Sequence, residues 1–126
     1  MRALLCKVGQ MPIEVDIPNK LEMLQQIVGG YIETIDYPDL NAAIVLDEEG
    51  KLKGKEANAP VYNLDLTKEG YINIIPTGDY IAGDFLVVGT GDEDFDDLPD
   101  ISIAIFYQLY EGDADEEDID DGDYEV

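Results

Sequence analysis

The distribution of charge limits which part of this chain can form a core. Positions 91–126 hold sixteen acidic residues and no basic residue, a net charge of −16, whereas residues 1–90 hold fourteen acidic and seven basic residues, a net charge of −7. Mutual repulsion at this density opposes compact packing. We therefore predict a single domain over residues 1–110, with an acidic loop at residues 91–100, followed by an acidic C-terminal tail at residues 111–126.

The first third of the chain combines extended and helical patterns. Residues 2–8 and 13–17 predict short strands. The apolar residues that follow Pro18 have helical spacing and predict a helix: Leu21, Leu24, Ile27 and Val28. Gly29 and Gly30 come next, and a residue just past a helix end usually adopts a left-handed conformation that costs glycine little. We therefore expect the helix to end there, before a strand at residues 31–36.

Most of the remaining apolar runs are typical of strands. We expect a strand at residues 41–47 that forms a hairpin with residues 51–54, an irregular stretch over residues 55–70, and a final strand at residues 101–110. Two turns are expected between these segments, at residues 76–78 and 83–84. The predicted fold class is α+β, with one main helix packed on a curved, mostly antiparallel sheet and an acidic C-terminal extension.

Three motifs in this order carry a resemblance to a known family. VGGYIE at residues 28–33, DEEGKLKG at residues 47–54 leading to Asn58, and Gly83 before a late strand resemble a family of small proteins of unknown function from phages, plasmids and Gram-positive bacteria. The resemblance covers about residues 1–89. It implies a setting on mobile genetic elements, where proteins that disarm bacterial defences are common. The acidic extension that follows departs from the shorter family pattern.

The residue types present argue against most catalytic centres. With no histidine and one cysteine, Cys6, the chain lacks the usual nucleophile–histidine pairs and zinc sites. Asp92, Asp94 and Asp96 occupy the first, third and fifth positions of a calcium loop, but Asp97 replaces the glycine required at the sixth. We therefore expect no enzymatic activity, no cofactor and no metal site.

The location and the class of partner follow from polarity and charge. The amino terminus, MRALLCKVG, is too short and too polar for a signal peptide, and no apolar run is long enough to span a bilayer. We expect a protein of the bacterial host cytoplasm. A net charge of −23 opposes direct binding to nucleic acid or to an anionic membrane, so attraction must be toward basic surfaces.

The spacing of the carboxylates is close to that of phosphates in nucleic acid. Double-stranded DNA carries one charge per ~1.7 Å of axis, or ~3.4 Å per strand. The ten carboxylates of residues 111–126 would lie roughly 5 Å apart in an extended chain and roughly 2.4 Å apart in a helix, values that bracket the single-strand spacing. Asp92, Asp94 and Asp96 on an extended chain would lie on one side, about 6.6 Å apart.

These spacings predict a non-enzymatic DNA mimic of the anti-CRISPR or anti-restriction type. It would occupy the basic groove of a nucleic-acid-binding defence protein, with both acidic blocks held on one scaffold by the strand at residues 101–110 and with Phe95 and Tyr124 as aromatic anchors. The residues predicted to contact the partner are Asp92, Glu93, Asp94, Asp96, Asp97, Asp113, Asp115, Glu116, Glu117, Asp118, Asp120 and Asp121.

Three alternatives stay open. The tail can be passive and only solubilising. The chain can instead be a small ligand- or protein-binding module of a mobile element, in which the corner with Tyr31, Glu33 and Asn58 recognises a nucleotide signal or a protein. For Glu33 and Asn58 the ordinary expectation is structural, as an exposed strand position and as a residue that locks a turn. A homodimer through edge strands is the third alternative.

Overall fold

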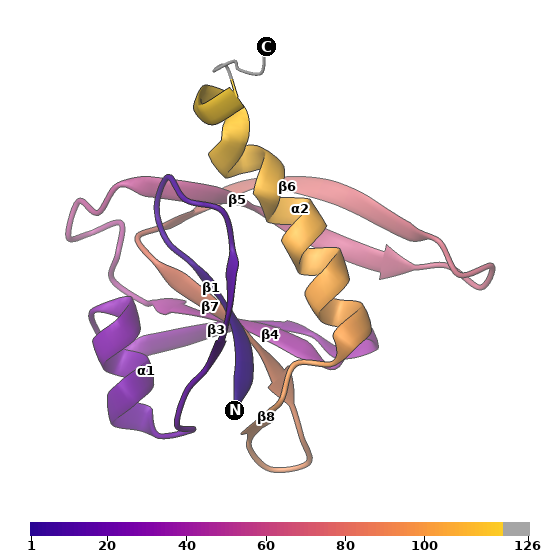
Figure 1. The fold of residues 1–126 in the computed structure, drawn as a ribbon, viewed down its shortest axis with the longest axis horizontal. Coiled ribbons are helices and arrows are strands. Elements are labelled where there is room, and N and C mark those ends of the chain that lie inside the picture. Colours follow the sequence, from indigo (N-terminus) through magenta and orange to yellow (C-terminus); the bar gives the residue numbers. More distant parts are fainter. Residues whose placement is uncertain (120–126) are drawn as a thin grey trace.

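A six-stranded sheet forms the centre of the protein, with strand order β2–β1–β7–β4–β3 and with β8 paired to β7 (Figure 1). The computed structural model describes the backbone of residues 1–119 and the side chains of residues 1–111. The elements of the sheet and the short 3-10 helix within it are β1 (Arg2–Cys6), β2 (Ile13–Asp16), β3 (Ile32–Tyr37), η1 (Pro38–Leu40), β4 (Ala42–Asp47), β7 (Phe85–Thr90) and β8 (Phe95–Asp96).

Strands β4 and β7 lie in the middle of the sheet and are buried on both faces. Their register pairs Ile44 with Val87 and Val45 with Leu86. Ile44 and Val87 belong to one apolar cluster, on what we call the first face, and Val45 and Leu86 belong to a cluster on the second face. Alternate side chains of a strand point to opposite faces, so the continuous apolar runs of β4 and β7 suit strands that are covered on both sides.

Helix α1 (Leu21–Val28) covers the second face. Leu24 and Val28 are buried in the cluster of that face. The helix ends at Gly29, which has a φ of 84° and adopts the left-handed conformation. The predicted helix and its glycine end are therefore confirmed, as are the strands expected on either side of it. Of the four apolar residues expected on one side of the helix, Leu24 and Val28 are buried, whereas Leu21 is 55% exposed.

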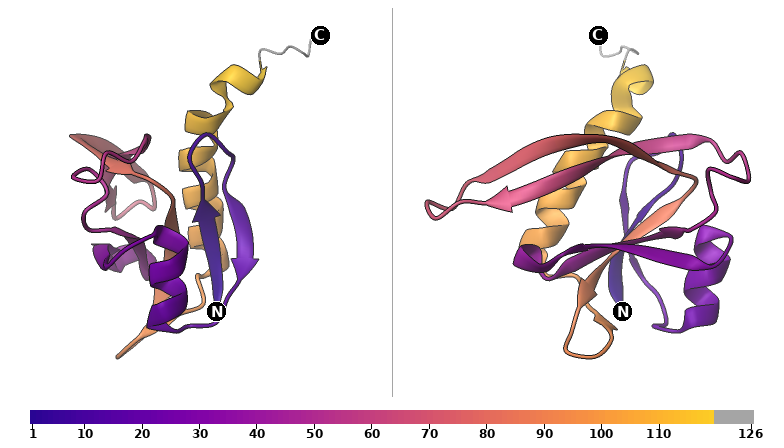
Figure 2. Two further views of the ribbon diagram at one scale, coloured as in Figure 1. Left: turned by 90° about the vertical axis from the view of Figure 1, so that its left-hand side faces the viewer. Right: turned by 180° about the vertical axis from the view of Figure 1, so that it is seen from behind.

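Helix α2 (Asp100–Ile119) and a long hairpin cover the first face (Figure 2). The hairpin consists of β5 (Ala57–Leu66) and β6 (Ile72–Ala82). Phe106 and Tyr110, one helical turn apart on α2, are buried in the cluster of the first face. Every strand pairing within residues 1–119 is antiparallel, so the predicted α+β class is confirmed.

The segment predicted as a final strand, residues 101–110, is instead the first half of α2. Its isoleucines favour a strand by residue type. Its buried positions, Ser102, Phe106 and Tyr110, recur every four residues, which is the spacing of a helix. Packing against the sheet therefore overrides the local preference. No helix in the described part of the chain is both long enough and apolar enough to cross a membrane.

Three predictions about the connections are wrong. Residues 51–54 form turns rather than the second strand of a hairpin with β4. The stretch expected to be irregular, residues 55–70, contains β5, whose Pro60 lies beside shifts in the pairing with β6. Proline is tolerated at edge strands and at bulges, so it does not end the strand. The turn expected at residues 76–78 lies within β6, whereas the turn at residues 83–84 is confirmed.

Candidate functional site

The first predicted acidic block lies around the loop that joins β7 to β8. Asp92, Glu93 and Asp94 are exposed in this loop. The backbone N–H of Gly91 donates to the carbonyl oxygen of Asp94 at 2.8 Å, which closes a turn. The segment therefore bends, unlike the extended chain that we predicted, and an even spacing of its alternate carboxylates does not result. Asp96, also exposed, lies in the short strand β8.

Arg2 lies among the acidic residues next to this loop. Its backbone N–H donates to Asp97 Oδ1 at 2.8 Å, and its Nε donates to Glu14 Oε2 at 2.7 Å. Its Nη1 forms an ion pair with Asp100, at the beginning of α2. Asp97 and its neighbours therefore hold the amino-terminal strand in place, which reduces the charge that this block can offer to a partner. Phe95 is half-buried and packs against the cluster of the second face, so only part of its ring is exposed to a partner, and its role as an anchor stays a prediction.

The second predicted acidic block lies mostly on α2. Five of its members belong to the helix: Asp113, Asp115, Glu116, Glu117 and Asp118. Asp120, Asp121 and Tyr124 lie outside the described residues. The 20 residues of α2 span ~30 Å, so the first block lies near one end of the helix and the second block toward the other. The expectation that a strand holds both blocks on the sheet is therefore wrong.

The glycine corner that ends α1 surrounds a buried ionic cluster. The carboxylate of Asp47 is 1% exposed, and its Oδ2 lies 2.7 Å from Lys55 Nζ and 2.9 Å from Lys53 Nζ. Lys55 Nζ also donates to the carbonyl oxygen of Val28 at 2.7 Å, and Lys53 Nζ donates to that of Gly29 at 3.0 Å. Cations near the end of a helix satisfy its last carbonyl groups. The two lysines thus join the loop after β4 to the end of α1.

This cluster explains why the corner contains two glycines. A Cβ atom at residue 30 would lie 2.6 Å from Asp47 Oδ1, and one at residue 29 would lie 2.6 Å from Lys55 Nζ. Gly29 also has a positive φ, which side chains rarely adopt. The two glycines of the motif that the family resemblance singled out are therefore explained by packing.

Asn58 and Glu33 have different environments. Asn58 Nδ2 donates to the carbonyl oxygens of Cys6 and Gly83, at 3.0 and 2.8 Å, so this side chain connects β1 to the turn between β6 and β7. Its role is structural, through these two distant segments rather than through a turn of its own. Glu33 is exposed on β3 and lines a cavity of about 330 Å³ that also contains Lys51.

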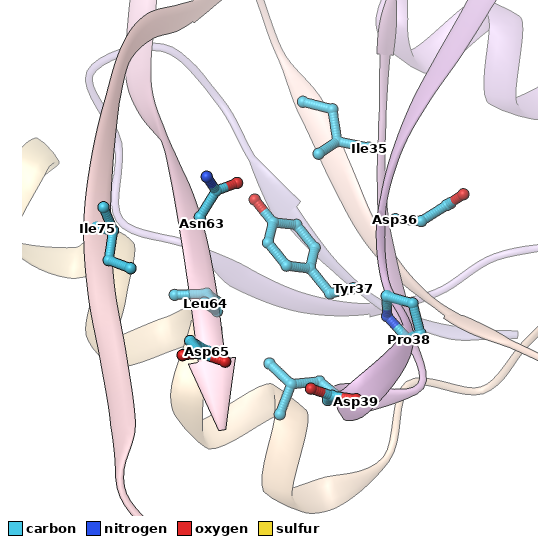
Figure 3. Close-up of a pocket in the computed structure, with 10 residues that line it drawn as sticks. Ile35, Asp36, Tyr37, Pro38, Asp39, Asn63, Leu64, Asp65 and Ile75 are labelled. Carbon is cyan, nitrogen blue, oxygen red and sulfur yellow. The ribbon is translucent and has the colours of Figure 1, made fainter. Parts of the chain in front are cut away.

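A larger cavity of about 440 Å³ lies between β3 and the hairpin. Figure 3 shows Ile35 and Tyr37 pointing from β3 toward the hairpin, with Asp39 and Asp65 at one end. The Tyr37 hydroxyl donates to the carbonyl oxygen of Tyr62 at 2.6 Å. Burial raises the pKa of Tyr37 to about 12, so this group remains a donor at neutral pH. Among the described lining residues there is no lysine, arginine, histidine or cysteine.

The part of the chain that the structure describes holds no cluster of three or more histidine, cysteine or carboxylate side chains that could bind a metal ion. A family model, a domain of unknown function called DUF3846, matches residues 1–111. No curated protein and no solved structure matches the chain. The matched range includes the acidic loop and the first half of α2, whereas the acidic residues from Asp113 onward lie beyond it.

Proposed function

The chain belongs to the family of the domain of unknown function DUF3846, and because that description names no activity, we propose a function from the charge and geometry of the chain itself. We propose that it is a non-enzymatic inhibitor, encoded by a phage or plasmid, that acts as a DNA mimic. The acidic half of α2 occupies the basic groove of a nucleic-acid-binding defence protein, a CRISPR effector or a restriction enzyme, in the cytoplasm of the bacterial host.

The observation that carries this proposal is the density of carboxylates on α2. Residues 111–118 contain six acidic residues and no basic one, within a helix that extends to Ile119. At ~1.5 Å of rise per residue, this density is one charge per roughly 2 Å of helix axis, close to the ~1.7 Å of double-stranded DNA.

The same residues oppose the dipole of the helix that carries them. The C-terminal end of a helix has partial negative charge, so a carboxylate there destabilises the helix by ~0.3–1 kcal/mol. The last turn of α2, as the structure describes it, contains no basic residue. A basic groove supplies the missing positive charge. Binding of the partner and stability of the acidic half of α2 are therefore coupled.

Two variants with the same charge change test the proposal. The helix variant replaces six acidic residues by their amides: Glu111, Asp113, Asp115, Glu116, Glu117 and Asp118. The body variant does the same to six exposed residues elsewhere: Asp36, Glu48, Glu49, Glu56, Asp65 and Glu69. The measurement is the release of labelled duplex DNA from a Cas9–guide complex and from a type I restriction enzyme, at low and high salt.

We expect the helix variant to lose inhibition by about tenfold or more, equivalent to ~1.4 kcal/mol of binding free energy, and to show a weaker dependence on salt. The body variant should retain most of the activity. Unchanged inhibition by the helix variant, or an equal loss in both variants, contradicts the proposal. A pull-down from bacterial lysate at low and high salt extends the test to partners outside these two classes.

The alternative, a ligand- or protein-binding module with a passive acidic tail, is supported by one observation. Glu33 lines the cavity of about 330 Å³, next to the pair formed by Lys51 and Asp79. Under this alternative, removal of residues 112–126 leaves partner capture from lysate intact, whereas Glu33→Gln abolishes it. The DNA-mimic proposal requires the opposite result for both changes.

A further inference from the structure

A groove on the protein surface separates α2 from the β5–β6 hairpin. It has a volume of about 460 Å³, and the described side chains that line it are Tyr62, Ile72, Ile74, Ile105, Gln108 and Leu109. Three of these come from the hairpin and three from α2, and Gln108 is the one that is neither apolar nor aromatic. Ile74 is 53% exposed, so a branched apolar side chain stands open to solvent at the groove.

The groove lies directly before the acidic half of α2. Leu109 precedes Glu111 by two positions, and the six acidic residues of positions 111–118 occupy the next turns of the same helix. None of the described lining residues carries a charge. An uncharged, largely apolar groove therefore adjoins a dense set of carboxylates.

We infer that this groove is the docking site for a basic amphipathic helix of the protein partner. Apolar side chains on one face of that helix fill the groove, while lysines and arginines that flank this face meet the carboxylates of α2. The inference rests on the proposed function and adds to it a desolvated apolar contact, the kind of contact that dominates binding energy in most interfaces. The groove therefore favours those basic partners that carry apolar residues beside their lysines and arginines.

Charge complementarity favours this occupant over a second copy of the chain. Each copy carries a net charge of −23, so two copies would bring two acidic helices together without a compensating base on α2. The same repulsion disfavours an anionic lipid surface. A segment with both lysines and apolar side chains satisfies the carboxylates and the groove together.

The test uses two synthetic helical peptides with the same number of lysines. One carries leucine on a face that the lysines flank, and the other carries glutamine on that face. The protein variants are Ile74→Ser and Ile74→Thr, of which the second keeps a β-branched side chain suited to a strand. The matched control is Ile75→Ser, because Ile75 is 47% exposed and lines the cavity toward β3 instead. Fluorescence anisotropy measures peptide affinity.

We expect the wild-type protein to bind the leucine peptide about tenfold more tightly than the glutamine peptide. Both Ile74 variants should lose most of this preference, Ile75→Ser should retain it, and the salt dependence should be the same in all of them. Equal affinity of the wild type for the two peptides, or equal losses in the Ile74 and Ile75 variants, overturns the inference. So does a dimer in sedimentation equilibrium that Ile74→Ser dissociates, because a second copy would then occupy the groove.

Failure of this inference is distinguishable from failure of the proposed function. If only the inference fails, the preference for leucine is absent, but the helix variant still loses inhibition. If the DNA-mimic function fails, the helix variant keeps its inhibition whatever the peptides show.

Discussion

Lys55 Nζ lies 2.7 Å from Asp47 Oδ2, beneath the glycine corner that ends α1. The carboxylate is 1% exposed, whereas the lysine side chain is 26% exposed, so the pair has one buried partner and one partner near the surface. Lys55 Nζ also reaches the carbonyl oxygen of Val28. Removing one partner of a buried ion pair is far more costly than removing an exposed pair. We therefore predict from this contact how the free energy of unfolding changes when one partner is removed.

Asp47→Asn should lower the free energy of unfolding by about 2 kcal/mol at neutral pH. Burial alone would raise the pKa of Asp47, but hydrogen bonds from Lys55, Lys53 and the backbone of Glu49 outweigh it and lower the pKa from 3.8 to about 2. This difference corresponds to about 2 kcal/mol of stability, which is fully present above the ordinary pKa and is lost as the pH falls through about 2. Urea unfolding over an acidic pH series measures it.

The control for this change is Asp79→Asn, because Asp79 forms an exposed ion pair with Lys51. We expect no measurable change in its unfolding midpoint. Two results would contradict this prediction. Either both substitutions lower the free energy of unfolding equally, or the loss caused by Asp47→Asn stays the same down to the lowest pH.

Gly30→Ala should destabilise the protein by ~1–3 kcal/mol, because the site has no room for a methyl group. The new Cβ would lie 2.5 Å from Lys53 Nζ and 2.6 Å from Asp47 Oδ1. Lys53 can move toward solvent, whereas the buried carboxylate cannot. A double-mutant cycle with Asp47→Ala isolates this contact. If Gly30→Ala costs as much with Asp47→Ala as without it, the explanation by steric contact is incorrect.

Tyr37→Phe should cost ~1 kcal/mol at neutral pH, because the carbonyl of Tyr62 loses this hydroxyl donor. The pKa of Tyr37 is raised from 10.0 to about 12 by burial, so its contribution is present below the ordinary pKa and is lost as the pH rises through about 12. The wild type should therefore lose stability over this alkaline range more steeply than the variant. Tyr80→Phe, at a side chain that is 45% exposed, is the control and should change the free energy of unfolding at neutral pH by much less.

The helix variant should have a higher helix content than the wild type at low salt. Neutral side chains near the end of α2 no longer oppose its dipole, and each charge removed from the last turn contributes ~0.3–1 kcal/mol. Far-ultraviolet circular dichroism measures the difference, which should shrink at high salt because ions screen the charges. The body variant is the control. If the two variants have equal helix content at low salt, the dipole does not limit α2.

Elements with a strong local signal were predictable from the sequence. Helix α1 combines apolar residues at helical spacing with Gly29 at its end, and both signals act within a few residues. Helix α2 was not predictable in this way, because Ile101, Ile103 and Ile105 favour a strand by type. The buried positions of α2 recur every four residues, but which positions are buried depends on packing against the sheet.

The candidate site likewise has features that could be predicted from the sequence and features that could not. The sequence predicted which acidic residues belong to the site. It did not predict the ion pairs that Arg2 forms with Glu14 and Asp100, or the ~30 Å helix that separates the two acidic blocks. The local pattern assigned Lys53 to a hairpin and Lys55 to the irregular stretch that follows it. In the structure both lysines contact Asp47 and the last carbonyl groups of α1. The apolar groove at Ile74 was not predicted, because its lining comes from segments distant in sequence.

The amino-acid sequence by itself determined the charge imbalance, and with it the prediction of basic partners, because net charge does not depend on how the chain folds. It also determined the elements whose signals are local. The tertiary structure alone decided that residues 101–119 form a helix, where the acidic blocks lie, and which groove adjoins them. The physical reason is that periodicity specifies which side of an element is buried, whereas only packing specifies what that side is buried against.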